Sequence, residues 1–163
     1  MEKICVDIMG PCKIRRKRKY ILILKAVTII DPVNRWFEIA QYNDKKAMTV
    51  VNFVETTWLV SYPWPVEITY GRGGELLGHE LKNSLIEQEY GIETKPDSSR
   101  NPQANTTTER IHKVLVNLIR TYKLHDKYVD DFDPCMGILA EAALAVQYMY
   151  HRTKKKKSGL ISF

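Results

Sequence analysis

Residues 20–30 (YILILKAVTII) constrain the fold of this chain more than any other segment, because apolar and β-branched side chains dominate them. Such a run favours a buried strand. Residues 2–9 alternate weakly before it and end at Gly10-Pro11, which predicts a strand followed by a turn. A third apolar segment at residues 36–41 follows. The start of the chain therefore predicts an antiparallel meander of three strands.

Helical and strand patterns alternate over the rest of the chain. The predicted helices are 45–61, 75–90, 106–123 and 132–151, the predicted strands are 66–70 and 92–95, and a polar loop is predicted at 96–105. The order βββαβαβαα predicts an α/β layered fold in which a five-stranded mixed sheet is flanked by helices. We expect one domain over residues 1–153 and a basic, disordered tail over residues 154–163.

The composition favours a folded domain. Hydrophobic residues make up 44% of the 163 residues and charged residues 27%, which is typical of globular proteins. No apolar run approaches the roughly 20 residues of a membrane span, so we expect no membrane partner. Three cysteines without a CxxC pair, a first segment unlike a signal peptide, and histidines without zinc-ligand spacing indicate an intracellular protein. The three tryptophans are interpreted as packing residues rather than as platforms for nucleic-acid bases.

The net charge of +6 is concentrated in two short runs. Residues 15–19 supply five positive charges, and Arg152 with residues 154–157 supplies five more, which leaves 15 basic against 19 acidic residues elsewhere. Such runs suit polyanion binding or nuclear targeting. A solvated turn and a solvated tail are the alternative interpretation.

Two acidic residues stand out by their positions. Asp7 lies inside an apolar strand, where an unpaired carboxylate is costly and therefore suggests a function. Glu109 lies at the start of a predicted helix, and Thr106-x-x-Glu109 also fits a capping box.

Phosphoryl transfer between nucleic-acid strands uses two divalent cations about 3.5–4 Å apart. Carboxylates from separate elements that meet at one sheet edge would hold such ions, since Mg²⁺ prefers oxygen ligands.

Four short segments carry a family resemblance: DIMGP at 7–11, IDP at 30–32 with WFE at 36–38, NPQAN at 101–105 and ERIH at 109–112. With them, residues 2–151 resemble the catalytic core of a retroviral or retrotransposon (Ty3/gypsy-like) integrase, which has the ribonuclease-H-like fold. The spacing of the Asn-Pro-Gln loop and the Glu-Arg pair is the most specific part. The resemblance implies Mg²⁺ or Mn²⁺ as cofactor, and DNA integration by metal-dependent polynucleotidyl transfer.

The resemblance also assigns roles to individual residues. Asp7 matches the first catalytic, metal-binding carboxylate and Glu109 the third. Gly71 stands where the second, an aspartate, is expected, and glycine has no side chain to hold a metal ion. Glu75 lies four residues further on, and we do not expect it to replace the missing metal ligand. We therefore expect an enzyme whose activity is lost or greatly reduced, with weak or absent cofactor binding.

The resemblance further implies DNA and protein partners. The residues that it assigns to DNA binding are Gln103, Asn105, Lys113 and Arg120. His112 is interpreted as a surface residue or one that lies behind the site. A homodimer through helices 45–61 and 132–151 is expected from the resemblance alone. Two alternatives stay open: a non-catalytic DNA- or protein-binding module derived from a transposable element, and a decayed fragment of such an element.

Overall fold

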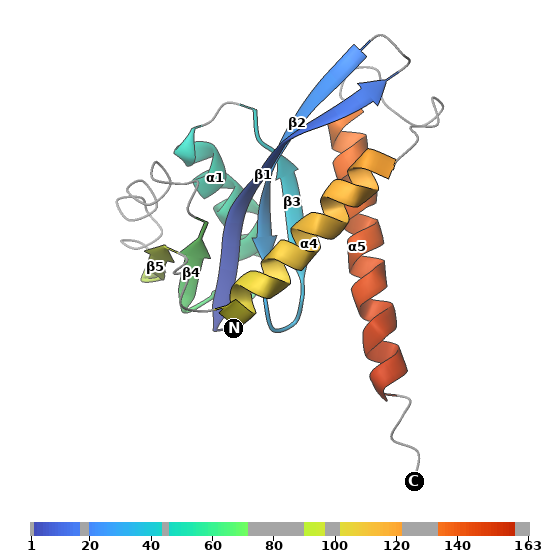
Figure 1. Cartoon of the computed structure of the whole chain (residues 1–163). Coiled ribbons are helices and arrows are strands. Elements are labelled where there is room, and N and C mark those ends of the chain that lie inside the picture. The colour runs from blue at the N-terminus through green and yellow to red at the C-terminus, as the bar shows by residue number, and fades with distance from the viewer. Residues whose placement is uncertain are drawn as a thin grey trace.

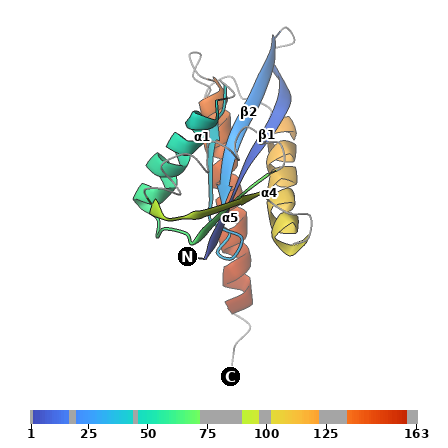
Figure 2. The same ribbon diagram turned by 90° about the vertical axis from the view of Figure 1, so that its left-hand side faces the viewer.

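The computed structural model describes residues 2–16, 20–43, 46–71, 90–96, 102–121 and 134–158. Its elements are β1 (Lys3–Arg16), β2 (Tyr20–Ile30), β3 (Phe37–Gln41), α1 (Ala47–Phe53), the π-helix η1 (Val54–Leu59), β4 (Glu67–Tyr70), β5 (Glu93–Pro96), α4 (Pro102–Thr121) and α5 (Pro134–Ser158). Figure 1 shows α1 on one side of the sheet and α4 and α5 on the other, and Figure 2 shows the same layers from the side.

The five strands form one mixed sheet in the order β3-β2-β1-β4-β5, which confirms the predicted sheet. β1 pairs antiparallel with β2, and β2 with β3, as the predicted meander requires. β4 and β5 are parallel to β1, and the described pairing of β1 with β4 ends at Val6 and Tyr70. The residues that follow this pair, Asp7 and Gly71, therefore lie side by side where β4 ends and β1 continues.

The turn predicted at Gly10-Pro11 is wrong, because β1 continues through it. The pairing with β2 shifts register between Met9 and Cys12, as in a β-bulge. Gly10 has a φ of +106°, and a Cβ there would lie 2.6 Å from the Leu24 carbonyl oxygen. Glycine thus permits an irregularity within the strand rather than ending it. Beyond this point β1 and β2 form a long two-stranded ribbon (Figure 1).

Helix α4 begins at Pro102, earlier than the predicted start at residue 106. Proline suits the first helical position, where its missing N–H removes no helical hydrogen bond. Thr106 consequently lies inside the helix, and the capping-box interpretation of Thr106 and Glu109 is wrong. Gln103 and Asn105 belong to the first turns of α4 and not to a loop.

The other predicted helices differ mainly in their ends. The predicted helix at 45–61 is divided between α1 and the π-helix η1. α5 continues past residue 151 to Ser158, through lysines that the prediction assigned to a disordered tail. The predicted helix at 75–90 lies outside the described residues except for Tyr90. Among the described helices, none combines the length and the apolar character that crossing a membrane requires.

Two apolar layers cover the two faces of the sheet. One contains Val50, Val54 and Trp58 of α1 and η1, packed against side chains such as Ile4 and Ile29. The other lies beneath α4 and α5, and it contains Met9, Ala26, Ile111, Leu115, Ile119, Ile138, Leu139 and Val146. Side chains on alternate positions of each strand enter opposite layers, as the pleat requires.

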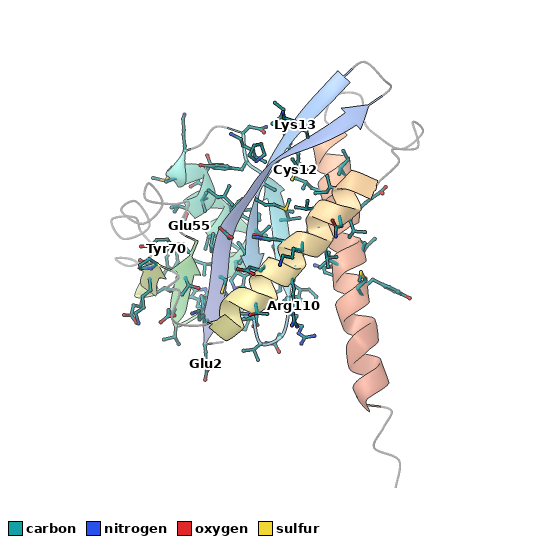
Figure 3. The ribbon with its side chains drawn as sticks, in the orientation of Figure 1. Glu2, Cys12, Lys13, Glu55, Tyr70 and Arg110 are labelled. Carbon is teal, nitrogen blue, oxygen red and sulfur yellow. The ribbon has the colours of Figure 1, made fainter. Side chains whose placement is uncertain are left out.

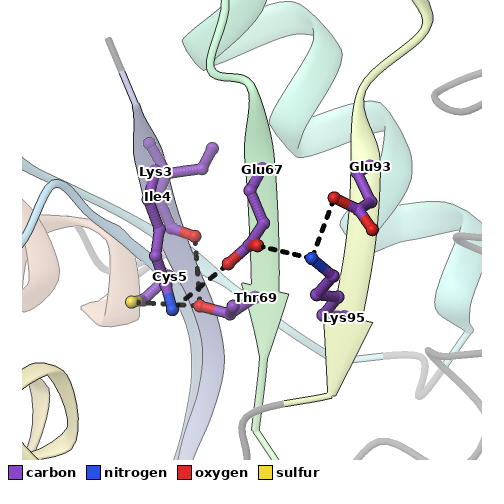
Figure 4. Close-up of polar contacts among 7 residues, drawn as sticks. All are labelled: Lys3, Ile4, Cys5, Glu67, Thr69, Glu93 and Lys95. Carbon is purple, nitrogen blue, oxygen red and sulfur yellow. Dashed lines mark hydrogen bonds and ion pairs between the residues drawn. The ribbon is translucent and has the colours of Figure 1, made fainter. Parts of the chain in front are cut away.

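Polar contacts stabilise the ends of the strands. Asp31 is a turn residue, as predicted: its Oδ1 accepts hydrogen bonds from the backbone N–H groups of Val33 (2.8 Å) and Asn34 (3.0 Å). The Glu67 carboxylate of β4 forms ion pairs with Nζ of Lys3 on β1 (3.3 Å) and Nζ of Lys95 on β5 (3.0 Å), so these contacts link three neighbouring strands (Figure 4). Burial opposes ionisation of Glu67, but hydrogen bonds from both lysines outweigh it and lower its pKa.

Candidate functional site

Asp7 and Gly71 are neighbours on β1 and at the end of β4. The Gly71 N–H donates a hydrogen bond to the Val6 carbonyl (3.1 Å), which extends the parallel pairing by one residue. A Cβ built on Gly71 would overlap Oδ1 of Asp7 and lie 2.8 Å from its Cγ. The carboxylate of Asp7 therefore occupies the space that a side chain at position 71 would need.

His112 of α4 is the side chain that faces the other oxygen of Asp7. Its Nδ1 lies 3.6 Å from Oδ2 of Asp7, and the two side chains are 17% and 33% exposed. Oδ1 of Asp7 accepts a hydrogen bond from the Ile8 N–H at 2.9 Å. The carboxylate is thus oriented by backbone on one side and faces an imidazole on the other.

Thr28 fixes the orientation of this imidazole. It pairs with Asp7 across β1 and β2 and is fully buried. Its hydroxyl donates to the Asp7 carbonyl (3.1 Å) and lies 2.8 Å from Nε2 of His112. A hydroxyl has one hydrogen, so it donates to only one of these two atoms, and the tautomer of His112 sets the direction of its bond with Nε2.

Burial dominates the electrostatics of both groups. It raises the pKa of Asp7, although the His112 charge and the Ile8 N–H bond act to lower it. Burial likewise lowers the pKa of His112, against the opposing effect of Asp7. Both shifts favour uncharged forms, because a low-dielectric site disfavours isolated charge.

A two-ion magnesium centre does not fit these residues. Glu109 is exposed on α4, one turn before His112. Across the described part of the chain, no group of three or more His, Cys, Asp or Glu side chains is arranged to hold a metal ion. Position 71 supplies no ligand, and Asp7 fills the space beside it. The structure thus brings Asp7 together with Gly71 and His112, and Glu109 lies one turn before His112 on the same helix.

The predicted DNA-binding residues all lie on α4. Lys113 is exposed, as is the preceding cation Arg110, which Figure 3 labels on this helix. The opposite side of α4 is buried through Ile111, Leu115 and Ile119. α4 therefore presents cations on one side while its apolar side packs against the sheet.

The sequence suggested a place behind the site as one of two readings of His112 and gave Thr28 no role. Thr28 is a polar residue within an apolar strand, and His112 lies three residues after Glu109, so both carried a weak signal. Their partnership depends on residues 84 positions apart and needed the structure.

No protein-family model and no curated protein matches this chain. Among solved structures, the catalytic core domain of BIV integrase superposes with a TM-score of 0.59 at 12% identity, covering 94% of this chain and 97% of that one. The HTLV-2 integrase catalytic core domain in complex with magnesium, in its trimeric form, gives 0.58 at 16% identity, covering 87% and 82%.

A third match comes from the simian T-cell lymphotropic virus intasome in complex with PP2A regulatory subunit B56 gamma. Its TM-score is 0.58 at 14% identity, covering 87% of this chain and 46% of that one. These matches, together with the strand order, show the ribonuclease-H-like fold of retroviral integrase cores. At such low identity they show the fold alone.

Proposed function

We propose that this chain is an integrase-type core, derived from a Ty3/gypsy-like retrotransposon, that binds DNA and has lost most or all of its polynucleotidyl-transfer activity. One observation carries the proposal: the Asp7 carboxylate lies where a side chain at position 71 would be. A metal centre built on these residues lacks the second carboxylate, and the Asp7 side chain fills the space that it would need. The fold and the exposed cations of α4 support continued DNA binding.

We expect the native protein to join a labelled DNA end to target DNA at least about 100-fold more slowly than an active integrase. Loss of groups that merely support a metal ligand costs about 10–100-fold, and here a ligand itself is missing. The assay is run with Mg²⁺ and with Mn²⁺, beside an active integrase. Joining at a comparable rate would refute the loss of chemistry while leaving DNA binding untouched.

DNA binding is expected to depend steeply on salt and on the exposed side of α4. Replacing Arg110 and Lys113 together by alanine should make the slope of log affinity against log salt less negative by about 2, because each phosphate contact contributes about 0.9. Fluorescence anisotropy with a duplex at several salt concentrations measures this slope. Lys46→Ala, an exposed lysine beside α1, is the matched control. An unchanged slope in the double variant would argue against this surface.

The exposed apolar residues of α5 favour association of two copies of this chain into a homodimer. Leu144, Tyr148 and Met149 are 67%, 70% and 52% exposed along this helix. We expect light scattering to give a dimer for the native protein and a monomer for Leu144→Glu combined with Tyr148→Glu. Val33→Glu, at an equally exposed turn residue, should leave the dimer intact. A native monomer at high protein concentration would contradict this interface.

A further inference from the structure

The outer part of the β1–β2 pair is a ribbon of only two strands. In it Cys12–Arg16 pairs with Tyr20–Leu24, over a length of about 14 Å. β4 pairs with β1 only over Lys3–Val6, and β3 pairs with β2 only over Ala26–Ile30. Among the described residues, no third strand therefore borders the ribbon. Figures 1 and 2 show that it extends past the ends of α4 and α5.

The base of the ribbon is anchored in the core, which matters because an isolated hairpin is only marginally stable in water. Cys12 and Leu24 pair with each other and are buried in the layer beneath α4 and α5. The next pair, Lys13 and Ile23, is exposed, as the alternation of side chains along a strand requires. Figure 3 shows Lys13 further along the ribbon than Cys12. One face of the ribbon thus begins in the core, and the other lies in solvent.

The charge of the ribbon has one sign. Its ten paired residues include Lys13, Arg15 and Arg16 and no acidic residue. Arg15 pairs with Ile21, two positions along each strand from the pair of Lys13 and Ile23, so both pairs belong to the same face of the pleat. This face therefore combines cations with β-branched apolar residues.

A basic ribbon of two strands has the dimensions of the major groove of B-form DNA. That groove is about 12 Å wide and admits a pair of strands, which lie about 4.8 Å apart. A third strand would widen the ribbon by about 4.8 Å and hinder its entry. The major groove of an RNA duplex is deep and narrow and excludes protein side chains. Shape and charge together thus favour duplex DNA over duplex RNA.

We propose that the β1–β2 ribbon enters the major groove of double-stranded DNA. Lys13, Arg15 and Arg16 contact phosphates there, and Ile23 packs against apolar base edges such as thymine methyl groups. The inference rests on the proposed function, DNA binding, and adds to it a surface different from the exposed cations of α4. Because the two surfaces belong to different elements, each can be tested by its own variants.

Fluorescence anisotropy of the full chain, with a DNA duplex and an RNA duplex of the same sequence, tests the ribbon. The triple variant Lys13→Ala, Arg15→Ala and Arg16→Ala should weaken DNA binding at least about tenfold at about 0.1 M salt. Its slope of log affinity against log salt should be less negative by about 2–3, whereas its RNA affinity should change less than about threefold. Ile23→Ser should weaken DNA binding about fourfold without changing the slope, since it removes apolar contact and no charge.

A second triple variant controls for net charge. Lys154→Ala, Lys155→Ala and Lys156→Ala on α5 together remove the same charge, and DNA affinity should stay within about threefold of the native value. Equal losses in the two triple variants would overturn the proposal, because net charge alone would then set the affinity. Equal losses of DNA and RNA affinity in the ribbon variant would also overturn it.

An unchanged salt slope in the ribbon variant would overturn the proposal as well, and is expected if the cations only prevent pairing between exposed strand edges. If Arg110→Ala with Lys113→Ala then still weakens binding, the proposed function stands without the ribbon. A native chain that does not bind DNA refutes both. Circular dichroism verifies folding. If the triple variant is unfolded, Lys13→Ala alone decides, through a slope less negative by about 1.

Discussion

Replacement of Trp58 by alanine is expected to lower the free energy of unfolding by about 3–5 kcal/mol. Trp58 lies on η1 and is one of the largest fully buried side chains. Its ring centroid is 4.4 Å from that of Tyr62, and it packs in the layer between the sheet and α1. Urea unfolding measures the loss, which should also lower the melting temperature on the order of 10 °C.

Trp64 provides the matched control. Its side chain is 54% exposed and meets Tyr90 edge to face, with the ring centroids 5.0 Å apart. Trp64→Ala should cost about 1 kcal/mol, since it removes much less buried area. Equal losses in the two variants would contradict the assignment of Trp58 to the core.

Introducing an aspartate at position 71 is expected to destabilise the protein by about 1–3 kcal/mol when no metal is present. The new Cβ would overlap Oδ1 of Asp7, so the existing carboxylate must move and give up its bond to the Ile8 N–H. Two carboxylates would then share a partly buried site, where like charges repel. Urea unfolding in the presence of a chelator measures the cost.

The Gly71→Asp variant should recover stability when Mn²⁺ is added, because a cation offsets the repulsion and binds only the folded state. Gly71→Ala adds the Cβ without the charge, so its stability should not respond to Mn²⁺. Full stability of Gly71→Asp in chelator would show that Asp7 leaves this space at no cost. Assays of DNA joining with the same variant test whether position 71 alone limits the chemistry.

The sheet could be predicted because its signals are local. The apolar run of β2 and the short strands around it follow from side-chain type, and the order of helices and strands restricts the topology. Gly10-Pro11 misled the prediction because the same residues favour a turn or a bulge, and the choice depends on the approach of Leu24 from β2. Pro102 was read as part of a loop, although proline also begins helices.

The site was harder to predict than the fold. The structure places position 71 beside Asp7, since both follow the last pair of two parallel strands. The pairing of Asp7 with His112 depends on how α4 packs across β1, which no spacing in the sequence encodes. Buried polar residues such as Thr28 offer a signal only after their partner is known.

The position of the Asp7 carboxylate has a consequence for the history of this chain. In a lineage that exchanged a side chain at position 71 for glycine, the neighbouring carboxylate could settle into the vacated space. A later reversion at that codon would then meet an occupied site and impose a folding penalty of its own. The change to glycine would therefore be easier to acquire than to reverse. A side chain at position 71 would then be tolerated only together with a rearrangement of Asp7.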